Sequence, residues 1–271
     1  MRRTVVTGLA VVFAVFVAGL VATGCGNDSG STSGSSASTT KASEVTGAIT
    51  LSAAASLTEA FAEIGEGFQR ANPEASATFN FGSSGTLATQ IQQGAPADSF
   101  ASADEANIDK LVTAGLIAGE PTVFARNRLV IVTKPGNPEQ VTGLSDLADL
   151  GVVSLCGLEV PCGKYADQIL TTAAVTIPTD RITRGQDVKT TLGAVSTGDA
   201  DAAIVYVTDA ESAGDSVETV TIPDAQNVIA IYPIAVIAAS TNQPTTRAFI
   251  DFVTGPKAQA TLRSFGFLPP D

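Results

Sequence analysis

The segment AITLSAAASLTEAFAEIGEGF, residues 48–68, decides the fold class, because its pattern changes from strand-like to helix-like within a few residues. Residues 48–51 form a short apolar run that is typical of a buried strand. Large apolar side chains then recur at the spacing of one helix face: Leu57, Phe61, Ile64 and Phe68. Ser56 and Glu59 match a capping box, which predicts Ser56 as the N-cap of this helix.

The same alternation of strand and helix patterns continues along the chain. Further strands are expected at residues 77–81, 99–101, 129–133, 152–155, 202–206, 219–222 and 229–239. Further helices are expected at residues 86–93, 107–114, 164–172, 188–196, 245–252 and 257–265. This rhythm predicts parallel sheets with crossover helices, in a chain long enough for two α/β lobes. Ligands of such folds bind outside the carboxyl ends of the strands.

The N-terminus indicates export from the cytoplasm. Residues 1–24 combine two early arginines with a long apolar run, which is typical of a secretory signal. The run ends in ATGC, residues 22–25, which resembles a bacterial lipobox and makes Cys25 the expected lipidation site. A transmembrane anchor is the alternative, since the run is near the minimum spanning length. Residues 25–46 are rich in Gly, Ser and Thr, which predicts a flexible tether or an O-glycosylated stalk.

The composition argues against several classes of function. Lys and Arg total 15 against 27 acidic residues, a net charge of −12, whereas nucleic-acid binding needs a basic surface. The chain contains no histidine, which excludes Ser-His-Asp and Cys-His nucleophile systems and the usual zinc sites. Ser56 does not lie in a G-x-S-x-G elbow, so a serine hydrolase is also disfavoured. We therefore expect neither an enzyme nor a metal site.

Two serine positions favour the binding of an anion. Ser56 follows the first strand, and Ser84 follows the second strand between Gly82 and Gly85. A helix N-terminus offers unpaired N–H groups and a partial positive charge, so an added hydroxyl completes an anion site without a cationic side chain. The alternative is that each serine only caps its helix. Two of them at neighbouring strand ends favour a shared ligand.

Several stretches resemble the periplasmic molybdate-binding proteins, the substrate-binding components of molybdate ABC transporters. The first two are AAASLTEAF, residues 53–61, and FGSSGTLATQIQQGAPADSFASAD, residues 81–104. NRLVIV, VPCGKYA, RGQDVKTTLGAV, AIVYVTDA, YPIAVI and FIDFVTGPKAQATLRSFGF follow in the family's order. The resemblance covers residues 48–268. It implies a solute-binding lipoprotein that captures molybdate, and tungstate with it, for an ABC permease.

The resemblance also implies an architecture. The family has the two-lobed periplasmic-binding-protein fold of type II, with a mainly parallel sheet and flanking helices in each lobe and a hinge of two crossing strands. Lobe 1 would comprise residues 47–125 and 232–271, and lobe 2 would comprise residues 126–231. We expect a monomer, because delivery to a permease requires free movement of the lobes.

The family holds its oxyanion between the lobes by neutral donors, and the resemblance assigns five of them here. Ser56 and Ser84 would donate from hydroxyl and backbone N–H groups, and Tyr206 from its phenol. Cys162 and Val188 would donate backbone N–H groups, although the family often has alanine at the position of Cys162. The alternatives are a water-facing hydroxyl for Tyr206 and core packing for Val188. No cofactor is implied.

Other ligands and other roles for nearby charges are also considered. Binding proteins of this fold take further oxyanions and small organic anions, which remain the alternative ligand class. The cationic side chains nearest to the predicted site are expected to be solvated rim charges: Lys189, Arg126, Arg128 and Arg184.

Three cysteines need an explanation. Cys156 and Cys162 flank the five residues GLEVP, and a disulfide is the default outside the cytoplasm. Free buried thiols and a metal pair are the alternatives, the latter disfavoured without further Cys or His ligands. Cys25 is then the odd cysteine, which lipidation would account for.

Overall fold

One mixed sheet runs through residues 45–271, the part of the chain that the computed structural model describes. Within these residues nine strands follow the order β2-β1-β3-β9-β4-β7-β5-β6, and β8 pairs with β4. The strands are β1 (Gly47–Ala54), β2 (Ala75–Gly82), β3 (Ser99–Ala101), β4 (Thr122–Thr133), β5 (Val153–Cys156), β6 (Ile182–Gly185), β7 (Ala202–Tyr206), β8 (Glu218–Thr221) and β9 (Ile229–Val236). The helices are α1 (Thr58–Ala71), α2 (Ser84–Gln92), α3 (Glu105–Thr113), α4 (Pro161–Thr172), α5 (Val188–Ser196), α6 (Val207–Ala213), α7 (Gln243–Thr254) and α8 (Pro256–Ser264).

Three predictions fall on residues that the structure does not describe. They are the secretory signal at residues 1–24, the lipidation of Cys25, and the tether up to residue 44. Within residues 45–271, no helix has the length and apolar character needed to span a bilayer.

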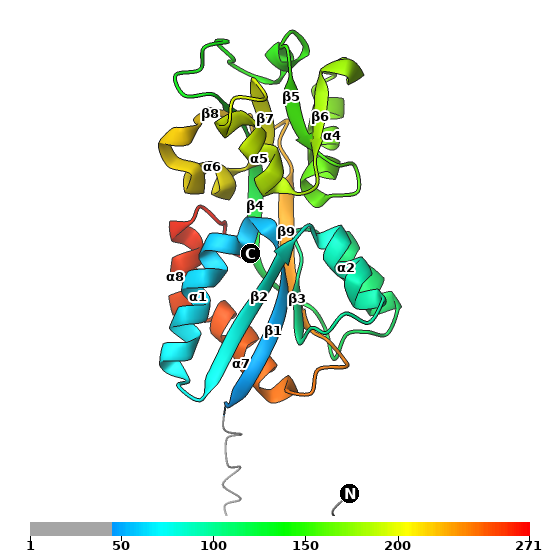
Figure 1. Ribbon diagram of the computed structural model, residues 1–271, viewed down its shortest axis with the longest axis vertical. Helices are drawn as coiled ribbons and strands as arrows, with labels where there is room; N and C mark the ends of the chain where they lie inside the picture. Colours follow the sequence, from blue (N-terminus) through cyan, green and yellow to red (C-terminus); the bar gives the residue numbers. More distant parts are fainter. Residues whose placement is uncertain (1–44) are drawn as a thin grey trace, which may run out of the picture. The chain divides into compact units, whose positions relative to one another are not determined.

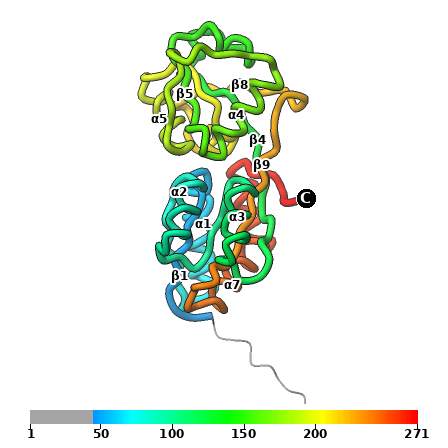
Figure 2. The backbone as a smooth tube through the Cα atoms, turned by 90° about the vertical axis from the view of Figure 1, so that its right-hand side faces the viewer, coloured from blue at the N-terminus to red at the C-terminus, as the bar shows by residue number. Residues whose placement is uncertain are grey.

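The elements gather at two ends of the long strands β4 and β9 (Figure 1). We call the first group, β1–β3 with α1–α3, α7 and α8, the β1 half, and the second group, β5–β8 with α4–α6, the β5 half. β4 pairs with β9 over Thr122–Arg128 and with β7 and β8 from Leu129 onward, so it belongs to both halves. Figure 2 shows β4 and β9 passing together from one half to the other.

These pairings confirm the predicted α/β class with flanking helices, and they also show how the sheet departs from a parallel one. β1 is parallel to β2 and β3, and β5 is parallel to β6 and β7. β4 and β9 run antiparallel to their neighbours because they are the connections between the halves. The predicted lobe boundaries at residues 125 and 231 stay a prediction, since the described residues fall in one compact unit.

The helix α1 shows why the sequence periodicity identifies the core. Its buried face carries Phe61, Ile64 and Phe68, as the spacing predicts. Phe61 and Phe68 make edge-to-face contacts with Phe249 of α7, at centroid distances of 6.1 and 5.2 Å. A Cβ atom at Gly65 would lie 2.6 Å from the Phe79 ring, so this glycine allows α1 to pack closely on β2.

Two sequence-based expectations about element ends are wrong. Ser56 is not the N-cap of α1: the cap residue is Leu57, without a side-chain cap, and Ser56 lies in a short 3₁₀ turn, Ala55–Leu57. α4 begins at Pro161 and not at Lys164, because proline is well suited to the first helical position. At the second turn the cap of α2 is Ser83 and not Ser84, since the Ser83 side chain accepts a hydrogen bond from Thr86 N–H.

Cys156 and Cys162 form a disulfide, as the sequence analysis expected by default. Cys156 ends β5 and Cys162 lies in the first turn of α4, so the bridge holds the start of α4 beside the end of β5. Both cysteines are buried. The free-thiol and metal-pair alternatives are thereby set aside.

We expect the double substitution Cys156→Ala, Cys162→Ala to lower the free energy of unfolding by about 2 kcal/mol, the chain-entropy value for so short a loop. Urea unfolding followed by circular dichroism measures this value. The midpoint should fall while the slope with urea stays the same. Superimposable unfolding curves for the two proteins would contradict the expectation.

Candidate anion-binding site

The structure brings all five predicted site residues into the wall of one small cavity of ≈ 210 Å³. Ser56 and Ser84 reach it from the β1 half, and Cys162, Val188 and Tyr206 reach it from the β5 half. Each residue follows or ends a strand, so the cavity lies at the carboxyl ends of the strands of both halves. The remaining lining residues are Ala54, Ala55, Gly82, Ser83, Ala103, Val160, Pro161 and Asp187.

Three helices begin at this cavity. The first residues of α2, α4 and α5 are Ser84, Pro161 and Val188, and all three line the wall. The first N–H groups of a helix have no partner within the helix, and the helix dipole gives this end a partial positive charge. The cavity is therefore surrounded by backbone donors that suit an anion.

Two serine hydroxyls in the wall already have partners within the protein. The Ser84 hydroxyl accepts a hydrogen bond from Ala103 N–H at 3.0 Å, so its own proton is available to an acceptor in the cavity. The Ser56 oxygen lies 2.9 Å from the Tyr232 hydroxyl oxygen, which explains why Ser56 is not used as a helix cap. Both serines are buried.

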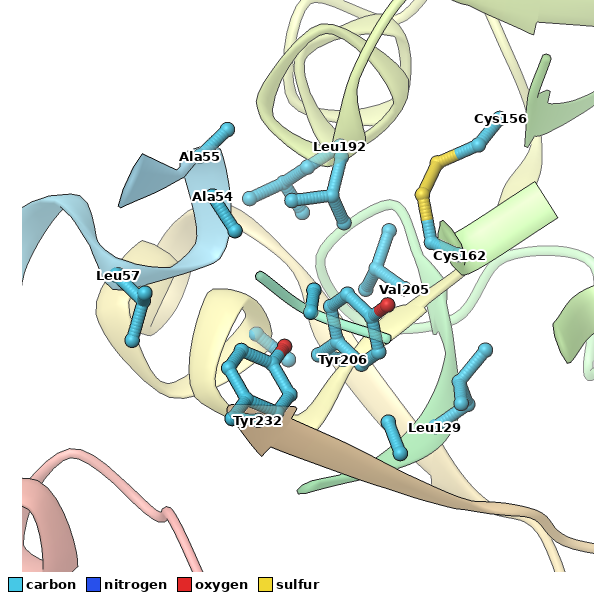
Figure 3. Close-up of a cluster of buried hydrophobic side chains, with 14 of the residues drawn as sticks. Ala54, Ala55, Leu57, Leu129, Cys156, Cys162, Leu192, Val205, Tyr206 and Tyr232 are labelled. Carbon is cyan, nitrogen blue, oxygen red and sulfur yellow. A yellow bond between two sulfur atoms is a disulfide. The ribbon is translucent and has the colours of Figure 1, made fainter. Parts of the chain in front are cut away.

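The Tyr206 hydroxyl is the polar group of the wall that most needs a partner. Tyr206 is 1% exposed, and its hydroxyl has no hydrogen-bond partner among the described residues. Leaving such a group unsatisfied costs about 1–3 kcal/mol. Figure 3 shows the Tyr206 and Tyr232 rings side by side, with Ala54 and Ala55 on one flank and the Cys156–Cys162 disulfide on the other. Burial raises the pKa of Tyr206 well above its usual value, so the phenol stays protonated and can donate.

No lysine or arginine lines the cavity, but one carboxylate, Asp187, does. The sequence analysis did not include Asp187 among the site residues. One of its oxygens accepts hydrogen bonds from Thr190 N–H and Thr190 Oγ1, both at 2.8 Å. Asp187 is therefore the N-cap of α5, and this carboxylate oxygen is hydrogen-bonded to the first turn of the helix.

The expectation of solvated rim charges is wrong for Lys189. Its side chain is 28% exposed, and its Nζ lies 2.7 Å from Glu59 Oε2 and 3.0 Å from Asp209 Oδ1. Glu59 belongs to α1 of the β1 half, whereas Lys189 and Asp209 belong to α5 and α6 of the β5 half. The Lys189–Glu59 ion pair therefore joins the two halves.

The three arginines pair with groups outside the cavity wall. Arg126 donates hydrogen bonds to the backbone oxygens of Pro269 and Asp271, and Arg184 donates one to the backbone oxygen of Cys156. Arg128 forms an ion pair with Asp224.

Asp209 is a fully buried carboxyl group with an altered pKa. Burial raises the pKa of Asp209 to about 6, although the positive charge of Lys189 partly opposes this. Burial lowers the pKa of Lys189, but the charges of Asp209 and Glu59 outweigh it and the net pKa is raised. The 3.0 Å contact between Lys189 and Asp209 is an ion pair without hydrogen-bond geometry.

Comparison with known proteins identifies the family. Residues 49–268 match the model of the bacterial extracellular solute-binding proteins. The chain belongs to this family. The molybdate-binding protein ModA of Mycobacterium tuberculosis is 41% identical over 267 residues, which cover 97% of each chain. The putative ABC transporter substrate-binding lipoprotein YvgL of Bacillus subtilis is 32% identical over 263 residues, which cover 94% of this chain and 97% of that one.

A solved structure agrees with this assignment. The substrate-binding domain of a putative molybdenum ABC transporter from Clostridium difficile superimposes with a TM-score of 0.65 and 31% identity, covering 83% of this chain and 99% of that domain. The relatives are solute-binding proteins and not enzymes, and they indicate no cofactor. The chain is therefore a solute-binding protein and not an enzyme.

We expect Asp209→Asn to change the pH dependence of the stability of this solute-binding protein. Because the pKa of Asp209 is about 6 in the folded state against an ordinary value of 3.8, the folded state binds this proton more tightly than the unfolded state. The resulting stabilisation is fully present below the ordinary value and is lost as the pH rises through 6. The free energy of unfolding of the wild type, relative to the variant, should therefore fall between about pH 4 and about pH 7. Urea unfolding at each pH measures this difference, and parallel pH profiles would contradict it.

Proposed function

We propose that this solute-binding protein captures molybdate, and tungstate with it, and delivers the anion to an ABC permease. The single observation that carries the proposal is the buried Tyr206 hydroxyl, which lacks a partner in a cavity lined by helix N-termini and serine hydroxyls. A tetrahedral oxyanion would accept hydrogen bonds from Tyr206, Ser56 and Ser84, and from the backbone N–H groups of Cys162 and Val188. The relatives named as molybdate-binding proteins support this choice of ligand.

The binding energy of such a site is sufficient without a cationic side chain. Hydrogen bonds to a charged group are worth about 1.5–3 kcal/mol each, so five of them can leave a micromolar to nanomolar affinity after the costs of association. The net charge of −12 opposes this only weakly, because physiological salt screens distant charges over about 8 Å. Local donors therefore outweigh the acidic surface.

The size of the cavity favours a small ion. Its ≈ 210 Å³ includes space that opens to solvent, so the volume that the wall encloses suits a small ion better than a larger organic ligand. Fixed donors also select by size, so a ring of donors set for molybdate or tungstate would contact the smaller sulfate poorly. The alternative function is a binding protein of the same fold for another oxyanion or a small organic anion.

Delivery would depend on movement between two lobes. We propose that residues 47–125 and 232–271 move as lobe 1 and residues 126–231 as lobe 2, with β4 and β9 as the hinge. An anion that accepts donors from both lobes favours their closed arrangement. The Lys189–Glu59 ion pair also spans the two lobes and would form as they close. A monomer would allow this movement.

We also propose that the chain is a lipoprotein on the outer side of the cell membrane. Removal of the signal at residues 1–24 would leave Cys25 as the lipidated N-terminus, and residues 25–46 would link it to the folded part. The lipoprotein YvgL, which aligns with 94% of this chain, supports this proposal.

Isothermal titration of residues 26–271 with molybdate, tungstate, sulfate and phosphate tests the proposed function. We expect one-to-one binding of molybdate and tungstate in the micromolar to nanomolar range, about 8–12 kcal/mol, and much weaker binding of the other two anions. Equal competition by sulfate would contradict the size selection. Silence from all four anions would overturn the oxyanion assignment and would direct the search to small organic anions.

A further inference from the structure

Four buried polar side chains connect the cavity to the strands that join the two halves. The Ser56 oxygen lies 2.9 Å from the Tyr232 hydroxyl oxygen, and the Asn127 amide nitrogen lies 3.5 Å from the same hydroxyl. Asn127 Nδ2 also donates to Thr208 Oγ1 at 2.9 Å. Asn127 is on β4 and Tyr232 on β9, and both are 0% exposed. Neither residue lines the cavity.

The direction of the hydrogen bonds in this network follows from fixed donors. Asn127 Oδ1 accepts from Arg128 N–H at 2.9 Å, which identifies the other amide atom as the nitrogen. An amide nitrogen only donates, so the Tyr232 oxygen is an acceptor toward Asn127. The Tyr232 proton then points to Ser56, the other partner that the structure gives this hydroxyl. The opposite direction would leave that proton without an acceptor among residues 45–271.

This direction leaves the Ser56 proton free. Because Tyr232 donates to the Ser56 oxygen, the proton of Ser56 turns toward the cavity, where an anion would accept it. Ser84 is oriented in the same way, since its oxygen accepts a hydrogen bond from Ala103 N–H and its own proton is left to donate. Both hydroxyls therefore present protons to the ligand. A ligand that carries a proton of its own at these positions would meet a donor and not an acceptor.

We propose that Tyr232 and Asn127 are positioning residues that fix the Ser56 hydroxyl as a donor, so that the position beside Ser56 favours a deprotonated oxygen of the ligand over a protonated one. This inference rests on the proposed function and adds to it the residues that set proton selectivity. Burial raises the pKa of Tyr232 far above its usual value, which is consistent with a phenol that remains a donor. Without the Tyr232 hydroxyl, the Ser56 hydroxyl can rotate and accept a hydrogen bond from a protonated oxygen of the ligand.

The three tyrosines of the chain provide a matched set of substitutions. Tyr232→Phe removes the positioning hydroxyl, Tyr206→Phe removes a proposed ligand donor, and Tyr165→Phe removes a half-buried hydroxyl that lies outside the cavity wall. Sulfate and hydrogen phosphate at about pH 8 are the probes, because both carry two charges and only the phosphate carries a proton. Each competes against molybdate bound to residues 26–271.

We expect Tyr232→Phe to shift the ratio of the two inhibition constants in favour of hydrogen phosphate by about threefold or more. Tyr206→Phe should weaken molybdate, sulfate and hydrogen phosphate together and leave that ratio near the wild-type value. Tyr165→Phe should change neither the ratio nor the affinity for molybdate. In a Ser56→Ala background, Tyr232→Phe should no longer affect the ratio, because Ser56 is the group through which it acts.

A second variant tests the same inference independently. Asn127→Asp has nearly the same shape, but its carboxylate accepts a hydrogen bond from the Tyr232 hydroxyl. The Tyr232 oxygen then accepts a hydrogen bond from Ser56, whose proton is turned away from the cavity. The added charge affects both dianions equally, so the ratio of the two inhibition constants should again shift in favour of hydrogen phosphate. Thermal unfolding verifies that each variant is folded, and Asn127→Asp decides the matter if Tyr232→Phe does not fold.

The outcomes separate this inference from the proposed function. A wild-type domain that binds no molybdate overturns the proposed function. A second result is that the wild-type domain binds molybdate while the folded variants show no increase in the affinity for hydrogen phosphate relative to sulfate. That result overturns only the positioning role of Tyr232 and Asn127. If Tyr165→Phe shifted the ratio of inhibition constants as much as Tyr232→Phe, that result would also overturn the positioning role.

Discussion

A buried hydroxyl needs a hydrogen-bond partner, and the Tyr206 hydroxyl has none among the described residues. This unmet requirement organises the cavity, since α2, α4 and α5 all begin around it with free backbone N–H groups. An acceptor with several oxygens can satisfy these donors together.

The fold supplies these donors by placing the carboxyl ends of strands from both halves around one point. β4 and β9 are shared by the halves, and the Lys189–Glu59 ion pair ties α5 to α1 beside the cavity. The disulfide holds the first turn of α4, in which Cys162 lies and lines the cavity. A backbone donor does not depend on the side chain, so the role that the resemblance implies for Cys162 needs the turn and not an alanine at this position.

The sequence predicts the local features of this arrangement well. The periodicity of α1 and the serines at two strand ends depend on neighbouring residues, which a pattern can capture. The resemblance to molybdate-binding proteins adds Cys162, Val188 and Tyr206 to the candidate site, and the structure brings them together with the serines. Their role in binding stays a prediction.

The features that sequence reasoning missed are contacts between distant residues. Ser56 bonds to Tyr232, 176 positions away, and therefore does not cap its helix. Lys189 is drawn from solvent by Glu59, 130 positions away. Asn127 meets Thr208 and Tyr232 only because β4 and β9 pair and α6 packs against β4. No local pattern encodes such partners.

A crystal structure of residues 26–271 with molybdate, using anomalous scattering at the molybdenum edge, tests the central claim most directly. The account predicts one anomalous peak in the cavity, with oxygens of the anion within hydrogen-bond distance of the Tyr206 hydroxyl and of the Ser56 and Ser84 hydroxyls. A peak elsewhere on the protein, or a bound anion that leaves the Tyr206 hydroxyl without a partner, would contradict it.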